Sequence, residues 1–186
     1  MTAPVTMANF SAEMTSPVET MSTTHGPAVA ATLARVFRDV WTASLDGPLE
    51  TATCACATPT NPSVAARVDF LGNWRGEIAL CLPEELATHV GATMFMMPPE
   101  DLSDADVRDA VGELCNMVGG NIRAALSPTC EMGTPHVFAC PDGAWSTRYT
   151  EQIASAHFIA RAHLVRVALF QGEAEACPVP QPQEPS

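Results

Sequence analysis

The chain has 186 residues, which is enough for one domain with a hydrophobic core and flanking tails. It carries 21 acidic and 9 basic residues, a formal net charge of −12, and such a surface repels nucleic-acid phosphates and anionic membranes. No window holds about 18 uninterrupted apolar residues, and no basic stretch followed by an apolar run stands at the N-terminus, so neither a transmembrane helix nor a secretory signal is predicted.

Three regions are expected along the chain. Residues 1–26 are rich in Thr, Ser, Met, Ala and Pro without a sustained period, which is typical of a disordered tail. Residues 173–186 form a second, Pro-rich tail, and residues 27–172 form the domain between the tails. The domain begins with a helix at Pro27. Its apolar positions fall on one helical face: Val29, Leu33, Val36, Phe37, Val40 and Trp41.

The next segments predict a hairpin and a second helix. Strands are expected at residues 64–71 and 77–82, joined by the turn residues between them. A helix then runs from Pro83 to about Met96 and is stopped by a Pro-Pro pair. Core packing is the expected role of the methionines at its end, with a partner-facing patch as the alternative. These are Met94, Met96 and Met97.

A long helix and several strands complete the domain. Ser103 is a good N-cap with Asp106 three residues later, and the helix of residues 104–126 follows it. Strands are expected at residues 135–140, 145–149, 153–160 and 163–170. Helices flanking consecutive hairpin strands predict an α+β fold, in which a largely antiparallel sheet packs against two long helices.

The helix of residues 104–126 has two contrasting faces. Its apolar stripe comprises Val107, Val111, Leu114, Val118 and Ile122. The opposite face carries Asp109, Glu113, Asn116 and Gly120, spaced i, i+4, i+7 and i+11. A solvated surface is the ordinary explanation of such a polar face. However, Asn competes for backbone hydrogen bonds within a helix, and Gly costs roughly 1 kcal/mol relative to Ala. A helix that must admit a loop of another protein gains from both, since Gly removes bulk and Asn offers a donor and an acceptor.

The pattern Asp109-x3-Glu113-x2-Asn116-x3-Gly120 resembles the signature helix of the CheC/CheX/FliY family of chemotaxis phosphatases. The first helix, over residues 30–41, resembles the opening helix of CheX-type domains. The likeness spans roughly residues 28–171, and a single copy of the pattern is the CheX-like arrangement.

The resemblance implies that the chain is a hydrolase, a protein aspartyl-phosphate phosphatase acting on a phosphorylated CheY-like receiver domain. Glu113 and Asn116 would be the catalytic pair, while Asp109 and Gly120 would help to bind the partner. Asn116 would hold the attacking water, and Glu113 would pair with a receiver lysine, because phosphoryl transfer depends mainly on positioning and electrostatics. The protein would need no cofactor of its own, since Mg²⁺ would belong to the receiver. CheX-like proteins can dimerise through sheet edges, so the resemblance also allows a homodimer.

Two other functions stay open at this point. The same fold could serve as a non-catalytic scaffold that binds a receiver or another signalling partner. A metal-binding redox protein could instead use Cys54 and Cys56, but a Cys-x-Cys pair without a second pair at ligand spacing predicts no metal site. The seven cysteines are odd in number and irregularly spaced, and Cys81 and Cys115 lie in apolar stretches as buried free thiols do. We therefore expect a reducing, cytoplasmic location.

Overall fold

The computed structural model describes residues 26–52, 63–126, 129–140 and 147–172. The predicted tails at residues 1–26 and 173–186 lie outside the described residues, apart from Gly26, and so do Cys54 and Cys56.

The described residues form one antiparallel sheet and a layer of helices. The strands are β1 (Leu49–Thr51), β2 (Ser63–Leu71), β3 (Gly76–Pro83), β4 (Glu131–Met132), β5 (His136–Cys140), β6 (Glu151–Ala160) and β7 (His163–Gln171). The helices are α1 (Gly26–Ser44), α2 (Glu84–Phe95), the 3-10 turn η2 (Pro99–Asp101) and α3 (Asp104–Leu126). The sheet order is β1-β6-β7-β3-β2-β4, and β5 also pairs with β2. The two long helices on an antiparallel sheet confirm the predicted α+β class.

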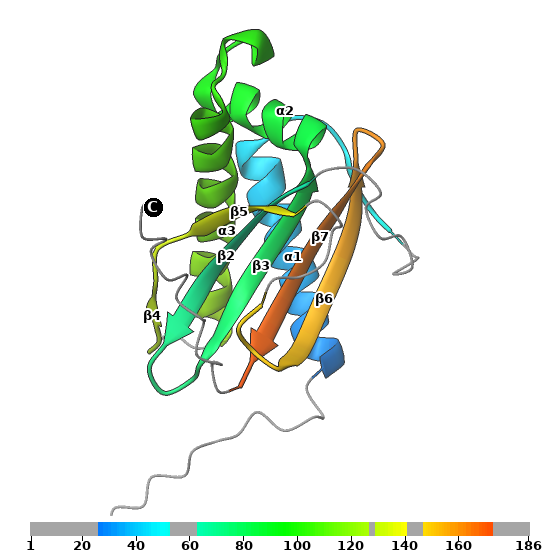
Figure 1. Cartoon of the computed structure of the whole chain (residues 1–186). Helices are drawn as coiled ribbons and strands as arrows, with labels where there is room; N and C mark the ends of the chain where they lie inside the picture. The colour runs from blue at the N-terminus through cyan, green and yellow to red at the C-terminus, as the bar shows by residue number, and fades with distance from the viewer. Residues whose placement is uncertain (1–25, 53–62, 127–128, 141–146, 173–186) are drawn as a thin grey trace, which may run out of the picture.

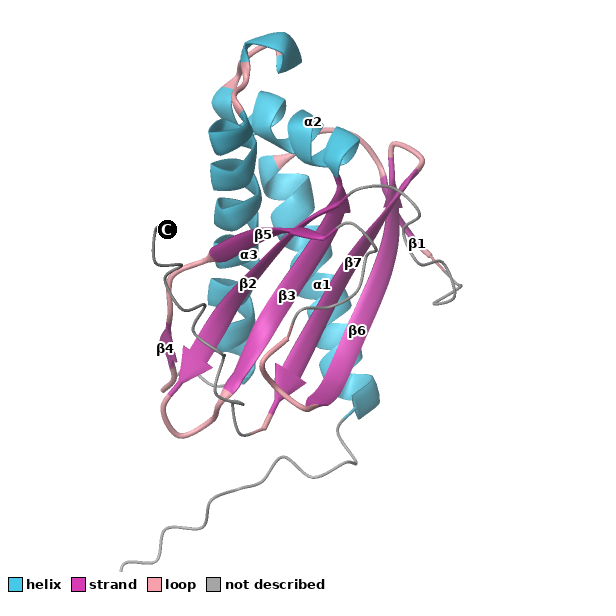
Figure 2. Ribbon diagram, viewed as in Figure 1, coloured by secondary structure: helices cyan, strands magenta, loops and turns pink. Residues whose placement is uncertain are grey.

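Helices α1 and α3 lie against one face of the sheet, and α2 lies at the end of this layer, mainly against α3 (Figures 1 and 2). Alternate residues of β3 project into the core between the layers, and Ile78, Leu80 and Leu82 are almost completely buried there. Helix α1 contributes the apolar face predicted from its sequence, with Phe37 stacked on Phe158 of β6 at a ring-centroid distance of 4.9 Å. Helix α3 packs on β2, β3 and β5, and α2 packs across α3.

Cap hydrogen bonds define both ends of the connection from α2 to α3. Helix α2 ends with Met96 in the left-handed conformation, at φ 53° and ψ 41°. The Met97 N–H bonds Ala92 O and the Met96 N–H bonds Thr93 O, which is a Schellman arrangement. A residue other than Gly costs roughly 1–2 kcal/mol there. Helix α3 begins with the predicted capping box.

That box is reciprocal. The Asp106 N–H donates to Ser103 Oγ at 3.2 Å, and the Ser103 N–H donates to Asp106 Oδ2 at 2.9 Å. These bonds to Ser103 lower the pKa of Asp106 below its usual value. The start of the long helix is therefore satisfied by its own side chains.

Several strand predictions need correction. The strand expected at residues 145–149 is wrong for Thr147–Tyr149, which are irregular, while residues 145 and 146 lie outside the described part. The Thr147 hydroxyl instead donates to Tyr149 O and accepts from the Tyr149 N–H, which folds this segment onto itself. The short strands β1 and β4 were not predicted, because two or three residues show no periodicity.

Candidate active site on helix α3

Helix α3 presents the two faces that its sequence predicts. Four of the five stripe residues are buried: Val111, Leu114, Val118 and Ile122. The fifth, Val107, is partly buried and packs against the same core. On the polar face, Asp109 and Glu113 are exposed, whereas Asn116 and Gly120 are half-buried. Glu113 is therefore open to another molecule, and Asn116 remains partly accessible beside it.

Glu113 and Asn116 contact one another. The Asn116 amide donates from Nδ2 to Glu113 Oε2 over 3.4 Å, a long and therefore weak hydrogen bond. A carboxylate is only an acceptor, so this contact assigns the amide nitrogen to the Glu113 side. Asn116 Oδ1 then points away from Glu113, with no donor to it among the residues that the structure describes. The pair offers a negative charge and, beside it, an open carbonyl acceptor.

Three glycines of α3 differ in what surrounds them. A Cβ at Gly112 would lie 3.1 Å from Val137 Cγ2, and one at Gly119 would lie 3.1 Å from Met132 Cε and 3.3 Å from Ile78 Cγ2. These two glycines, seven residues apart, let the helix approach the sheet closely. A Cβ at Gly120 would meet only Met132 Sδ, at 4.0 Å. Packing within the described fold therefore does not require glycine at position 120.

A groove of about 410 Å³ includes Glu113 of the pair in its lining. Asp109 and Glu113 line it from α3, and Phe95 lines it from the end of α2. The remaining lining residues are Arg108, Gly112, Pro135 and Val137. Sequence reasoning did not assign Phe95, Arg108 or Gly112 to the site. The seven-residue repeat of Gly112 and Gly119 was the one signal that could have revealed the close approach of α3 to the sheet.

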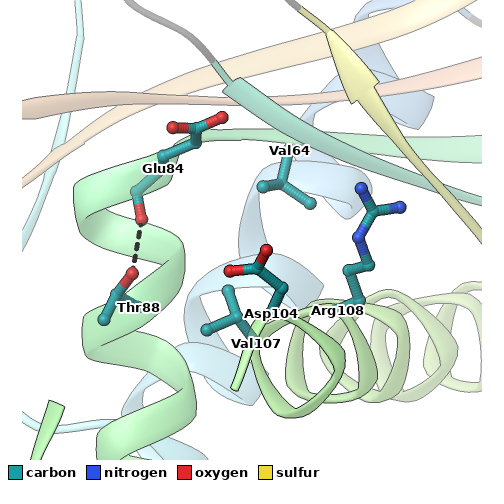
Figure 3. Close-up of a pocket in the computed structure, with 6 residues that line it drawn as sticks. All are labelled: Val64, Glu84, Thr88, Asp104, Val107 and Arg108. Carbon is teal, nitrogen blue, oxygen red and sulfur yellow. Dashed lines mark hydrogen bonds between the residues drawn. The ribbon is translucent and has the colours of Figure 1, made fainter. Parts of the chain in front are cut away.

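A second pocket, of about 220 Å³, lies at the N-terminal ends of α2 and α3 (Figure 3). Its lining residues are Val64, Glu84, Thr88, Asp104, Val107 and Arg108. The Thr88 hydroxyl donates back to Glu84 O within α2 at 3.0 Å. Arg108 lines both this pocket and the groove, and it is the one basic residue among the lining residues of each.

Cys115 directly precedes Asn116 but faces the core. Burial, and to a smaller extent the charge of Glu77, raises the pKa of its thiol far above the usual range. Cys81 is also a buried free thiol, as predicted. Thiolate chemistry therefore has no place at this site.

No three His, Cys, Asp or Glu residues within the described ranges are arranged to hold a metal ion. His89 lies 3.3 Å from Asp46 Oδ1, and the His136 ring packs against Phe138. Among the same residues, no helix combines the length and the apolar character needed to cross a bilayer.

Comparison with known proteins identifies the family. A family model described as "Chemotaxis phosphatase CheX" matches residues 64–158, from β2 to β6, and this range includes Asp109, Glu113, Asn116 and Gly120. The chain belongs to the CheX family. No curated protein sequence matches it.

Solved structures share the CheX fold with this chain. The chemotaxis protein CheX of Vibrio vulnificus is 18% identical with a TM-score of 0.61, and the match covers 76% of this chain and 95% of that one. CheX of Desulfovibrio desulfuricans is 24% identical with a TM-score of 0.58, covering 78% and 99%. A CheX-CheY-BeF3-Mg²⁺ complex from Borrelia burgdorferi is 17% identical with a TM-score of 0.57, covering 77% and 97%. At these identities the likeness concerns the fold.

Proposed function

We propose that this CheX-family protein hydrolyses the phospho-aspartate of a CheY-like receiver domain, with Glu113 and Asn116 as its catalytic residues. The observation that carries the proposal is the outward-facing contact between these two side chains on α3. The family assignment supports a phosphatase, and the Borrelia burgdorferi CheX, which shares the fold, forms a complex with CheY.

Asn116 would orient the attacking water. Its Nδ2 is engaged by Glu113, so Oδ1 can accept a hydrogen bond from a water molecule and turn the water oxygen toward phosphorus. A bond forms between that oxygen and phosphorus, the bond from phosphorus to the aspartate oxygen breaks, and the water protons leave with inorganic phosphate and solvent. A carboxamide is a weak base, but an acyl phosphate has a good leaving group, so positioning is the main requirement.

Glu113 would dock the receiver. An exposed carboxylate beside the water-holding amide can accept a charge-assisted hydrogen bond from a lysine near the phosphorylated aspartate. Removing that lysine from the phosphoryl group would leave room for the water. Mg²⁺ would be supplied by the receiver, and this chain would need no cofactor of its own.

Asp109 and Gly120 would complete the contact surface. Asp109 lies one turn before Glu113 and lines the same groove, where it adds negative charge facing the partner. Gly120 lies one turn after Asn116, with open space where a Cβ would stand, so a partner backbone can approach there. A receiver partner implies a cytoplasmic location. A homodimer through sheet edges remains a prediction.

The test follows decay of a phosphorylated receiver with and without this protein. CheY-like receivers from the same genome would be labelled with a small phosphodonor, and the phosphate released would be measured over time. The proposal predicts faster decay of at least one receiver. If the protein binds a phosphorylated receiver without changing its decay, the phosphatase proposal is wrong and a scaffold role replaces it.

A further inference from the structure

The C-terminal end of α2 carries an exposed apolar ridge, defined as Phe95, Met96 and Met97. The exposed fractions of these residues are 41%, 90% and 39%. Leu71 is the one other large hydrophobic residue that is exposed within the described ranges. Single exposed apolar residues are ordinary, but three consecutive ones form a patch that is typical of an interaction site.

Folding gives no reason for a methionine at position 96. The backbone there is left-handed, which favours Gly or Asn, and the side chain is almost entirely in solvent. Met94, two residues earlier, packs against the core as the sequence predicts. Met96 is therefore placed where it lowers stability and buries nothing of its own chain.

The ridge adjoins the candidate active site. Phe95 lines the groove that also contains Asp109 and Glu113. A protein that covers Glu113 can thus extend along the groove to the ridge. Arg108, in the same groove, forms no ion pair with any residue in the described part of the chain, so it too is available to a partner.

We propose that the ridge is the docking surface for the receiver domain, which would bury an apolar side chain against Met96 while a basic side chain meets Glu113. This inference rests on the proposed function. Charge favours a receiver over a second copy of this chain, because a second copy would bring a net charge of −12 and, at the same groove, two acids, Asp109 and Glu113, against the one cation Arg108. A lysine beside the phosphorylated aspartate would instead complement the two acids.

The test uses Met96→Asn in the full chain. Asparagine tolerates the left-handed conformation, so this variant should melt at the wild-type temperature or above it. Its dissociation constant for a CheY-like receiver loaded with Mg²⁺ and beryllofluoride should rise about tenfold, as expected when a buried apolar anchor is removed. Leu71→Asn is the matched control, since it also replaces an exposed apolar residue, at the far end of β2, and should leave the affinity unchanged.

Each outcome separates the docking surface from the chemistry. If Met96→Asn binds the receiver with wild-type affinity and keeps its phosphatase activity, the ridge is not the docking surface and the proposed function still stands. If Met96→Asn binds the receiver more weakly, but the wild type does not accelerate decay of the phosphorylated receiver, the ridge is the docking surface and the phosphatase proposal is wrong. The docking proposal is also wrong if no receiver binds the wild type. It is wrong as well if Met96→Asn changes the sedimentation of the protein alone and leaves its affinity for the receiver unchanged.

Discussion

The Asn116 amide donates from Nδ2 to Glu113 Oε2, three residues earlier on α3, at 3.4 Å. The two proposed catalytic residues are thus in contact in the chain on its own. The contact uses one carboxylate oxygen, so a lysine ammonium can bind Glu113 through the other. In the proposed account, Asn116 keeps this contact when the receiver docks, so that Oδ1 is oriented to accept from the water when the phosphoryl group arrives.

Glu113→Gln separates the charge of this residue from its contact with Asn116. The Gln carbonyl can still accept from Asn116 Nδ2, but it cannot form an ion pair with a receiver lysine. We expect KM for the phosphorylated receiver to rise about tenfold, consistent with the 1.5–3 kcal/mol that a hydrogen bond to a charged group contributes. The value of kcat should change less.

Salt dependence and a matched variant check this interpretation. The KM of the wild type should rise with ionic strength more steeply than that of Glu113→Gln, because the variant has lost a charge contact. Glu131→Gln, at an exposed glutamate on β4, should behave as wild type. If Glu113→Gln lowers kcat while KM stays constant, Glu113 acts in the chemical step and not in docking.

Gly120→Ala should stabilise the fold and weaken the activity. The added Cβ has open space, and Ala is favoured over Gly in a helix by about 1 kcal/mol. The same methyl group would intrude on a partner backbone, so receiver dephosphorylation should slow. Chemical denaturation and phosphate release measure the two effects.

Gly119→Ala, at the adjacent residue, is the control for the expected gain in stability and loss of activity in Gly120→Ala. Its Cβ would press on Ile78 Cγ2 at 3.3 Å, so its unfolding free energy should lie below that of Gly120→Ala. If Gly120→Ala has wild-type activity, Gly120 is not part of the partner-binding surface.

Glu77 makes the free energy of unfolding depend on pH. It is fully buried on β3, and burial raises the pKa of its carboxyl above the ordinary value of 4.5, an effect that Thr147 and the charge of Arg67 only partly offset. The folded state therefore holds this proton more tightly than the unfolded chain. Its contribution to stability is present below pH 4.5 and is lost as pH rises toward the raised pKa.

Glu77→Gln should abolish that loss. The unfolding free energy of the variant should exceed that of the wild type at about pH 7 and approach it at about pH 4, where the wild-type carboxyl is protonated. Denaturant unfolding at both pH values measures the difference. Glu50→Gln, at an exposed edge residue, is the control. A larger gain at the acidic pH would contradict the assigned sign.

The parts of this fold with strong periodicity could be predicted from sequence. The bounds of α3 followed from the cap at Ser103 and from an apolar stripe that repeats over its whole length. The β2–β3 hairpin followed from two apolar runs around a turn, and the register pairs Val68 with Ile78 as such a hairpin requires. In each case a local pattern coincides with burial.

Features that depend on distant segments could not be predicted. The groove brings Phe95 of α2 together with Glu113 of α3 and Val137 of β5, and no local pattern encodes that meeting. The predicted core packing is wrong for Met96 and Met97, which are exposed, and the partner-facing alternative fits them better. The left-handed backbone of Met96 turns it outward instead.

The most direct measurement is the decay of a phosphorylated receiver in the presence of Asn116→Ala and Asn121→Ala. Asn121 is an exposed asparagine on the same helix whose Nδ2 donates to Met117 O at 2.9 Å, so its removal is a matched loss of one carboxamide. We predict that Asn121→Ala accelerates decay as the wild type does. Asn116→Ala should bind the receiver yet lose about 100-fold in rate, the scale expected when a reacting group is no longer positioned. Wild-type rates in Asn116→Ala would contradict the account.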